Sequence, residues 1–137
     1  MISQGANAVK SGQHLETELA VIMQGNELTL ETQVKFTDCY NNPRSKMDFY
    51  IPELDLAIEC KRQMGSGTAD QKLPFVVENF KKFPSKYSLL VLDGDHYKNR
   101  TGIHSYLNSQ VSEYFNWCFI EDFSRVIDEQ TKNRAAT

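Results

Sequence analysis

The sequence lacks the long apolar run that a membrane-spanning helix requires. Its first residues, MISQGANAVKSGQH, lack the apolar stretch of a secretion signal. The three cysteines, Cys39, Cys60 and Cys118, are odd in number and far apart, so their spacing fits neither a disulfide framework nor a zinc site. Internal repeats, low-complexity tracts and a linker are also missing. These absences favour one soluble domain in a reducing, cytoplasmic setting.

A strong charge of either sign is missing as well. The 137 residues carry a net charge of −3, which does not suggest a protein that coats DNA nonspecifically. Basic residues nevertheless gather in the middle of the chain: Lys35, Arg44, Lys46, Lys61, Arg62, Lys72, Lys81, Lys82 and Lys86. Any one of them is as compatible with a solvated surface as with a nucleic-acid partner.

The chain is expected to begin with an amphipathic helix and a half-buried strand. Apolar residues at helical spacing predict the helix between Ser11 and Gly25, after loose residues 1–10. Alternating residues predict the strand over 28–36. The apolar side of this strand is expected to carry Leu28, Leu30, Val34 and Phe36. The polar side is expected to carry Thr29, Glu31, Gln33 and Lys35.

The next segment, KMDFYIPELDLAIECK, predicts two short strands joined by a tight turn over 52–55. A symmetric closure places Phe49 opposite Ile58 and Asp48 opposite Glu59. Alternation then puts an apolar set of side chains on one face: Phe49, Ile51, Leu56 and Ile58. The other face receives Asp48, Tyr50, Ala57, Glu59 and Lys61.

This register brings two carboxylates together across a strand pair. Asp48 and Glu59 would lie roughly 5 Å apart, which destabilises like charges unless something lies between them. A hard divalent cation would resolve the conflict, and Lys61 adds a positive charge on the same face. An acid pair beside an ammonium group is suited to hydrolysing a phosphodiester. The alternative is a surface strand pair in which each acid forms a salt bridge with Lys46 or Lys61.

A helix and a buried strand are expected to follow the hairpin. The helix is predicted to start near Leu73, with Pro74 in its first turn, and to end at Pro84. An earlier start is disfavoured because it would place Pro74 inside the helix, although residues 68–71 match a capping box. The apolar run over 87–92 predicts a central strand, which the intervening helix allows to be parallel.

The last third of the chain predicts two further helices and a short strand. The first helix is expected to bury Ile103, Leu107, Val111 and Tyr114, and the second Phe123, Val126 and Ile127. The strand is expected over 117–120, and the chain is expected to loosen at 131–137.

Several residues that could suggest chemistry are interpreted as structural. Asp93-Gly94-Asp95-His96 is expected to be a turn that closes a buried strand, since it lacks the ligand pattern of a calcium loop. Cys60 is expected to pack on the apolar face. His14 and His104 are assigned no chemistry. The aromatic residues Phe115, Trp117 and Phe119 are expected in the core rather than on a base-stacking surface.

The predicted order of helix, three antiparallel strands, helix and strand resembles the αβββαβ core of the PD-(D/E)XK nuclease superfamily. Asp48 and Glu59-Cys60-Lys61 match the family's first acid and its E-x-K element, over about residues 12–95. Glu16 is similar to an acid that many members carry on the first helix. Met47 stands where the family motif has proline. The stretch ECKRQMGSGTADQKLPF is similar to a segment of small phage and mobile-element nucleases.

The resemblance implies an α/β fold with a restriction-endonuclease-like mixed sheet flanked by helices, and a metal-dependent DNA endonuclease. Asp48, Glu59 and the backbone carbonyl of Cys60 would hold Mg²⁺ or Mn²⁺, and Lys61 would orient or help deprotonate the attacking water. Glu16 would hold a water or a second ion, or else be a solvated helix acid. The contacts to DNA would come from Gln63, Thr68, Gln71 and Lys72, although Thr68 and Gln71 are at least as well suited to capping a helix.

The size of the chain bears on its assembly, and two other functions stay open. A chain of this size has few residues with which to contact a DNA duplex, so a homodimer or larger homo-oligomer is expected. A Holliday-junction or other structure-selective resolvase is the alternative within enzymes. A catalytically inactive nuclease fold that serves as a DNA-binding or assembly module is the alternative from another class.

Overall fold

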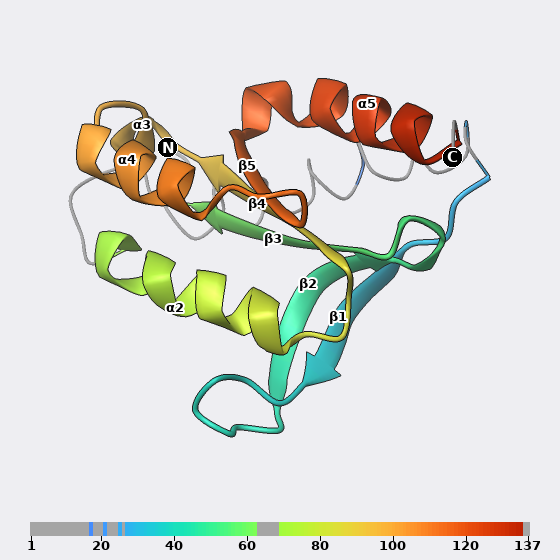
Figure 1. Ribbon diagram of the computed structural model, residues 1–137, viewed down its shortest axis with the longest axis horizontal. Helices are drawn as coiled ribbons and strands as arrows, with labels where there is room; N and C mark the ends of the chain where they lie inside the picture. The colour runs from blue at the N-terminus through green and yellow to red at the C-terminus, as the bar shows by residue number, and fades with distance from the viewer. Residues whose placement is uncertain (1–16, 18–20, 22–24, 26, 63–68, 136–137) are drawn as a thin grey trace, which may run out of the picture.

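Figure 1 shows the computed structural model of the protein, which describes residues 17, 21, 25, 27–62 and 69–135. The described residues form a mixed sheet of five strands in the order β1-β2-β3-β4-β5. The strands are β1 (Glu31–Phe36), β2 (Ser45–Ile51), β3 (Leu56–Arg62), β4 (Tyr87–Asp93) and β5 (Phe115–Phe119). The helices are α2 (Ala69–Lys82), α3 (Asp95–Lys98), α4 (Thr101–Gln110) and α5 (Phe123–Ala135), with short 3₁₀ turns η1 (Pro52–Leu54) and η2 (Ile120–Asp122). The predicted restriction-endonuclease-like α/β fold is confirmed.

The first three strands are antiparallel, and β4 and β5 run parallel to β3. The hairpin register is the predicted one, with Phe49 opposite Ile58 and Ile51 opposite Leu56. The 3₁₀ turn closes this hairpin, and Asp55 follows it with a left-handed φ of 49°. Aspartate tolerates that conformation better than most residues, which explains why so tight a turn forms here.

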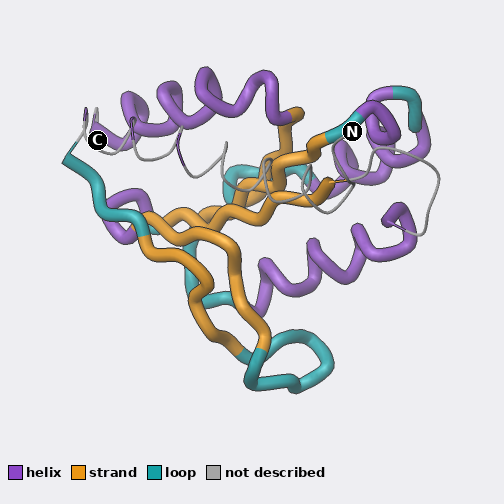
Figure 2. Tube along the Cα trace, turned by 180° about the vertical axis from the view of Figure 1, so that it is seen from behind, coloured by secondary structure: helices purple, strands orange, loops and turns teal. Residues whose placement is uncertain are grey.

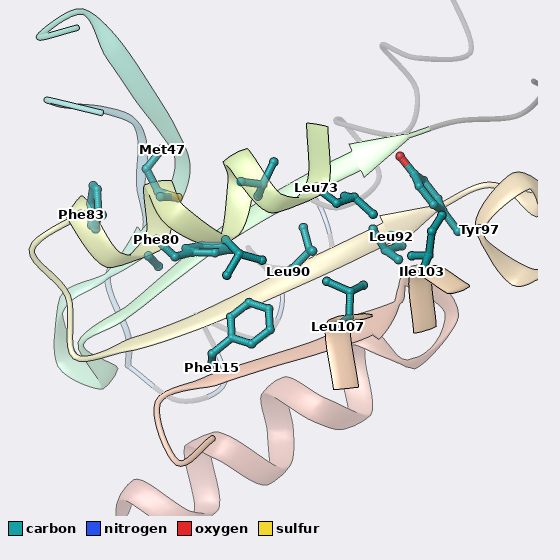
Figure 3. Packing of buried hydrophobic residues seen from close by; sticks show 13 residues of the cluster. Met47, Leu73, Phe80, Phe83, Leu90, Leu92, Tyr97, Ile103, Leu107 and Phe115 are labelled. Atoms are coloured by element: carbon teal, nitrogen blue, oxygen red, sulfur yellow. The ribbon is translucent and has the colours of Figure 1, made fainter. Parts of the chain in front are cut away.

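Helices cover both faces of the sheet. Figure 2 shows α5 on one face and α2 on the other. Under α5, the buried cluster contains Phe49, Ile51, Leu56, Ile58, Leu89, Val91, Phe123 and Ile127. Under α2 and α4, the second cluster contains Met47, Ala57, Leu73, Val76, Val77, Phe80, Leu90, Leu92, Ile103, Leu107 and Phe115. Most of the second set is drawn in Figure 3. Strand β4 contributes buried side chains to both clusters, as predicted for a central strand.

Helix α2 begins four residues earlier than its predicted start near Leu73. It runs from Ala69, so Pro74 lies inside the helix, the arrangement that the sequence disfavoured. The reason is tertiary packing, because the helix buries Leu73, Val76, Val77, Phe80 and Phe83 against the sheet. This burial outweighs the backbone hydrogen bond that the proline nitrogen cannot donate.

Strand β1 starts at Glu31, later than the predicted start at residue 28, and it does not keep one apolar side. Leu28 and Leu30 pack toward the α5 cluster, whereas Val34 and Phe36 pack toward the α2 cluster. The prediction that these four residues share a face was therefore wrong. Gln33 lies between the two pairs with a left-handed φ of 51°. Strand β2 changes face at the same level, since Met47 belongs to the α2 cluster and Phe49 to the α5 cluster.

The C-terminal part also differs from the prediction in three details. Strand β5 covers Phe115–Phe119 rather than 117–120, and Ile120 begins the turn η2. Helix α4 ends at Gln110, so Val111 and Tyr114 lie outside it and are 44% and 51% exposed. Helix α5 does not loosen at Thr131 but continues to Ala135. The Thr131 side chain is buried, and its hydroxyl donates a hydrogen bond to the Ile127 carbonyl. No helix among the described residues has the length and apolarity needed to cross a membrane.

Candidate active site

The predicted acids lie where β2 and β3 separate. The backbone pairing of these strands ends at Phe49 and Ile58, whereas β3 stays paired with β4 as far as Arg62 and Asp93. Asp48 and Glu59 are the next residues beyond the last pair. Figure 1 shows β1 and β2 turning away from β3 together, with α2 next to them. We call the region in which β2 separates from β3 the fork.

Each acid bonds to the backbone of the opposite strand. The Glu59 carboxylate accepts a hydrogen bond from the N–H of Asp48 at 3.0 Å. The Asp48 carboxylate accepts one from the N–H of Cys60 at 2.9 Å. The side chains thus replace the ladder hydrogen bonds that the separating strands no longer make. This places both acids at the fork and fixes their orientation through rigid backbone.

The charge of Glu59 is poorly compensated. Burial and, to a smaller extent, the nearby charge of Asp48 raise the pKa of Glu59 to about 7 against the opposing effect of Lys61. The ammonium nitrogen of Lys61 lies 3.4 Å from the Glu59 carboxylate. The carboxylates of Asp48 and Glu59 lie beside one partly exposed lysine, Lys61. The acids therefore carry more negative charge than this lysine offsets, which favours binding of a proton or a cation between them.

The donor set of the fork suits a hard cation. Asp48 and Glu59 supply carboxylate oxygens, and the backbone carbonyl of Cys60 is the predicted third ligand. Over the described ranges, no three His, Cys, Asp or Glu side chains cluster as a complete metal site. The Cys60 thiol is unsuited to the task, because it packs with the α5 cluster and burial raises its pKa to about 12.

Gln33 also lies beside the two acids, a position that the sequence pattern did not predict. Its side-chain amide lies 3.5 Å from the Asp48 carboxylate, a long hydrogen bond. Its β1 neighbours Thr32 and Val34 pair with Phe49 and Met47, so Gln33 stands directly across from Asp48. The predicted alternation put Gln33 among ordinary polar strand residues. Nothing in that pattern indicates a left-handed backbone, and the conformation is what sets this side chain apart.

The fork contains a pocket of about 230 Å³ between the strands and α2. Its lining residues are Phe36, Ser45, Lys46, Met47, Glu59, Lys61, Lys72, Phe75, Val76, Asn79 and Phe80. Lys72, one of the predicted DNA contacts, therefore shares a pocket with Glu59 and Lys61. Gln71 is exposed on α2, next to Lys72. Glu16, Gln63 and Thr68 fall outside the described residues.

The residues interpreted as structural occupy structural positions. Asp93 forms an ion pair with Arg62 at 3.5 Å, and Gly94 turns the chain with a φ of 121°. His104 lies against the rings of Trp117 and Phe119, and its Nε2 is 2.6 Å from the Tyr97 carbonyl oxygen. These aromatic residues pack with the α2 cluster, as predicted.

A family model described as a PD-(D/E)XK nuclease superfamily domain matches residues 7–129. No curated protein and no solved structure matches the chain. The matched residues include all five strands, the helices α2, α3 and α4, and the first half of α5. The chain belongs to the PD-(D/E)XK nuclease superfamily.

Proposed function

We propose that this nuclease domain is a metal-dependent endonuclease that hydrolyses DNA phosphodiester bonds with Mg²⁺ or Mn²⁺. The observation that carries the proposal is the placement of Asp48, Glu59 and Lys61 at one point of the fork. Two fixed carboxylates whose charge is only partly offset by one lysine are suited to binding a divalent cation next to a phosphate.

Each residue of the fork has a distinct role in the proposal. Asp48, Glu59 and the Cys60 carbonyl hold the cation. When bound, such an ion activates water and offsets charge on the phosphate. Lys61 reaches toward the same place from β3, and its ammonium group orients the attacking water or donates to a phosphate oxygen as negative charge develops. Gln33 holds Asp48 in place from β1.

The DNA backbone is proposed to run past the mouth of the fork. Lys72 on α2 and Lys61 on β3 line the same pocket, so both can face one strand. Gln71 is exposed beside Lys72. We include Gln63 and Thr68 as further DNA contacts, and Glu16 as a residue that holds a water or a second ion, on the strength of the family motif.

Cutting both strands of a duplex requires two such sites. We propose a homodimer or larger homo-oligomer, because a single fork presents one set of acids. The similarity of the segment after β3 to small phage and mobile-element nucleases supports such an origin, with the host cytoplasm as the site of action.

Plasmid nicking with Mg²⁺ or Mn²⁺ tests the proposal. We expect wild-type protein to convert supercoiled plasmid to the open-circular form, and Asp48→Asn and Glu59→Gln to lose this activity by at least about a hundredfold. Lys132→Ala, on the outer surface of α5, is the matched control and should retain wild-type activity. Equal nicking by all four proteins would refute the assignment of the site.

A second substrate separates the proposal from its nearest alternative. A four-way junction and a linear duplex of the same sequences are digested side by side. Preferential cleavage of the junction would identify a structure-selective resolvase. Binding of DNA without any cleavage, in both metals, would instead identify an inactive binding module.

A further inference from the structure

The pocket in the fork combines an apolar floor with a basic rim. Met47, Val76 and Phe80 form the floor and are 2–5% exposed. Lys46 and Lys72 are exposed at its rim, and Lys61 stands beside Glu59. A phosphate alone needs no apolar floor, and a hydrophobic ligand needs no lysines. A nucleotide, with a flat base and an anionic phosphate, matches both parts.

We propose that this pocket binds a single unpaired nucleotide next to the phosphate that is cut. The preferred substrate is then DNA with an extruded or single-stranded nucleotide rather than a regular duplex. This inference rests on the proposed function, because it places the nucleotide beside the same Glu59 and Lys61.

The aromatic walls of the pocket are suited to a base. Phe36 and Phe75 are half-buried among the lining residues, so their rings are partly open to the pocket. The Phe75 ring is held by stacking on Tyr40, with centroids 5.0 Å apart and planes 19° apart. Stacking on an aromatic ring contributes roughly 1–3 kcal/mol per base and tolerates every base.

The walls are also too close together for a duplex. The loop between β1 and β2 is tied to α2, since the N–H of Cys39 donates a hydrogen bond to the Asn79 side chain at 3.1 Å. The pocket volume of about 230 Å³ lies below the ~300–1,000 Å³ usual for small-molecule sites. One base can enter such a space only if it leaves its stack and its partner.

Binding of thymidine 5′-monophosphate in the presence of EDTA tests the pocket without any cleavage. NMR should show the methyl signals of Met47 and Val76 shifting, while those of Leu56 and Val126, which belong to the α5 cluster, stay in place. Lys46→Ala and Lys72→Ala should each weaken binding about tenfold. Lys132→Ala is the control and should bind as wild type does. Absence of the Met47 and Val76 shifts overturns the inference.

The separate parts of the nucleotide identify what the pocket recognises. Thymidine and inorganic phosphate should each bind at least about tenfold more weakly than the monophosphate. Inorganic phosphate that binds as tightly as the nucleotide would show a phosphate site with no role for the floor, which overturns the inference.

Cleavage of two matched duplexes tests the substrate class. One carries a single extra unpaired thymidine and the other is fully paired. We expect cleavage at least about tenfold faster beside the unpaired nucleotide, with Lys46→Ala reducing this preference. Equal rates on both duplexes overturn the inference and leave the proposed function standing. Nucleotide binding with no cleavage of either duplex refutes the proposed function and leaves the pocket assignment standing.

Discussion

Glu59 accepts a hydrogen bond from the backbone N–H of Asp48 at 3.0 Å. In return, the Asp48 carboxylate is held by the N–H of Cys60, the residue after Glu59. The two acids therefore position each other through the strands that carry them. Removing either side chain leaves a backbone N–H of the opposite strand without its acceptor, so the pair acts as one unit.

Stability should depend on pH through Glu59. Its pKa in the folded protein is about 7, against an ordinary 4.5. Because the folded state holds the proton more tightly, the stability gained from this group is complete below pH 4.5 and is lost as the pH rises through 7. The loss amounts to at most about 3 kcal/mol. Urea unfolding in EDTA at pH 5 and pH 8 measures it.

Magnesium should restore the stability lost at pH 8, because a cation replaces the proton between the acids. Glu59→Gln removes the titrating group, so this variant should show a flatter pH dependence and little response to Mg²⁺. A wild-type pH profile in the variant would mean that another group is responsible.

Lys61→Ala should separate metal binding from cleavage. Loss of the ammonium group is expected to slow plasmid nicking by roughly 10²–10⁴-fold, the range for a group that assists proton transfer or charge stabilisation. The Mg²⁺-induced rise in melting temperature should persist, because both carboxylates remain and a competing cation near Glu59 is gone. Unchanged nicking would exclude Lys61 from the chemistry.

Two substitutions of Gln33 should differ in stability and agree in activity. Gln33→Gly removes the amide and relieves the left-handed backbone, whereas Gln33→Ala removes the amide and keeps the strain. We expect the glycine variant to be about 1 kcal/mol more stable than the alanine variant. Both should show a kcat about tenfold below that of the wild type, measured by nicking of supercoiled plasmid. Full activity in both would leave Gln33 without a role at the site.

Pro74→Ala should stabilise the protein. The substitution restores an N–H donor inside α2 at an exposed position. The expected gain in the free energy of unfolding is about 2 kcal/mol, since an interior proline costs about 3 kcal/mol and its stiffening of the unfolded chain returns part of that. Chemical denaturation measures the gain, and Glu78→Ala on the same helix is the control. A loss of stability would show that the proline itself packs favourably.

The sequence predicted the hairpin well because local rules determine it. A short turn sets the register of two strands, and period-two alternation then decides which of their residues are buried. Phe49 and Ile58 follow these rules. The start of α2 and the packing of β1 follow tertiary interactions instead. Burial of the α2 face overrides Pro74, and β1 and β2 change from one buried cluster to the other at the level of Gln33.

The candidate site likewise contains some residues that the sequence predicted and others that it did not. Asp48, Glu59 and Lys61 were predictable because the register of the hairpin brings them near one another, although the strands stop pairing just before the two acids. Gln33 and Lys46 were not, since their place at the site depends on the bend of β1 and β2 away from β3. A bend of this kind leaves no periodic signal in the sequence.

Beyond Gln33 and Asp48, β1 and β2 continue as a regular ribbon, with Lys35 opposite Lys46 and Phe36 opposite Ser45. Side chains on such a ribbon repeat every two residues. Adding two residues to each strand would lengthen the arm without rotating the carboxylates at its base. Because Phe36, Ser45 and Lys46 of this arm also line the pocket, a longer arm would change the pocket wall while the carboxylates at its base keep their orientation.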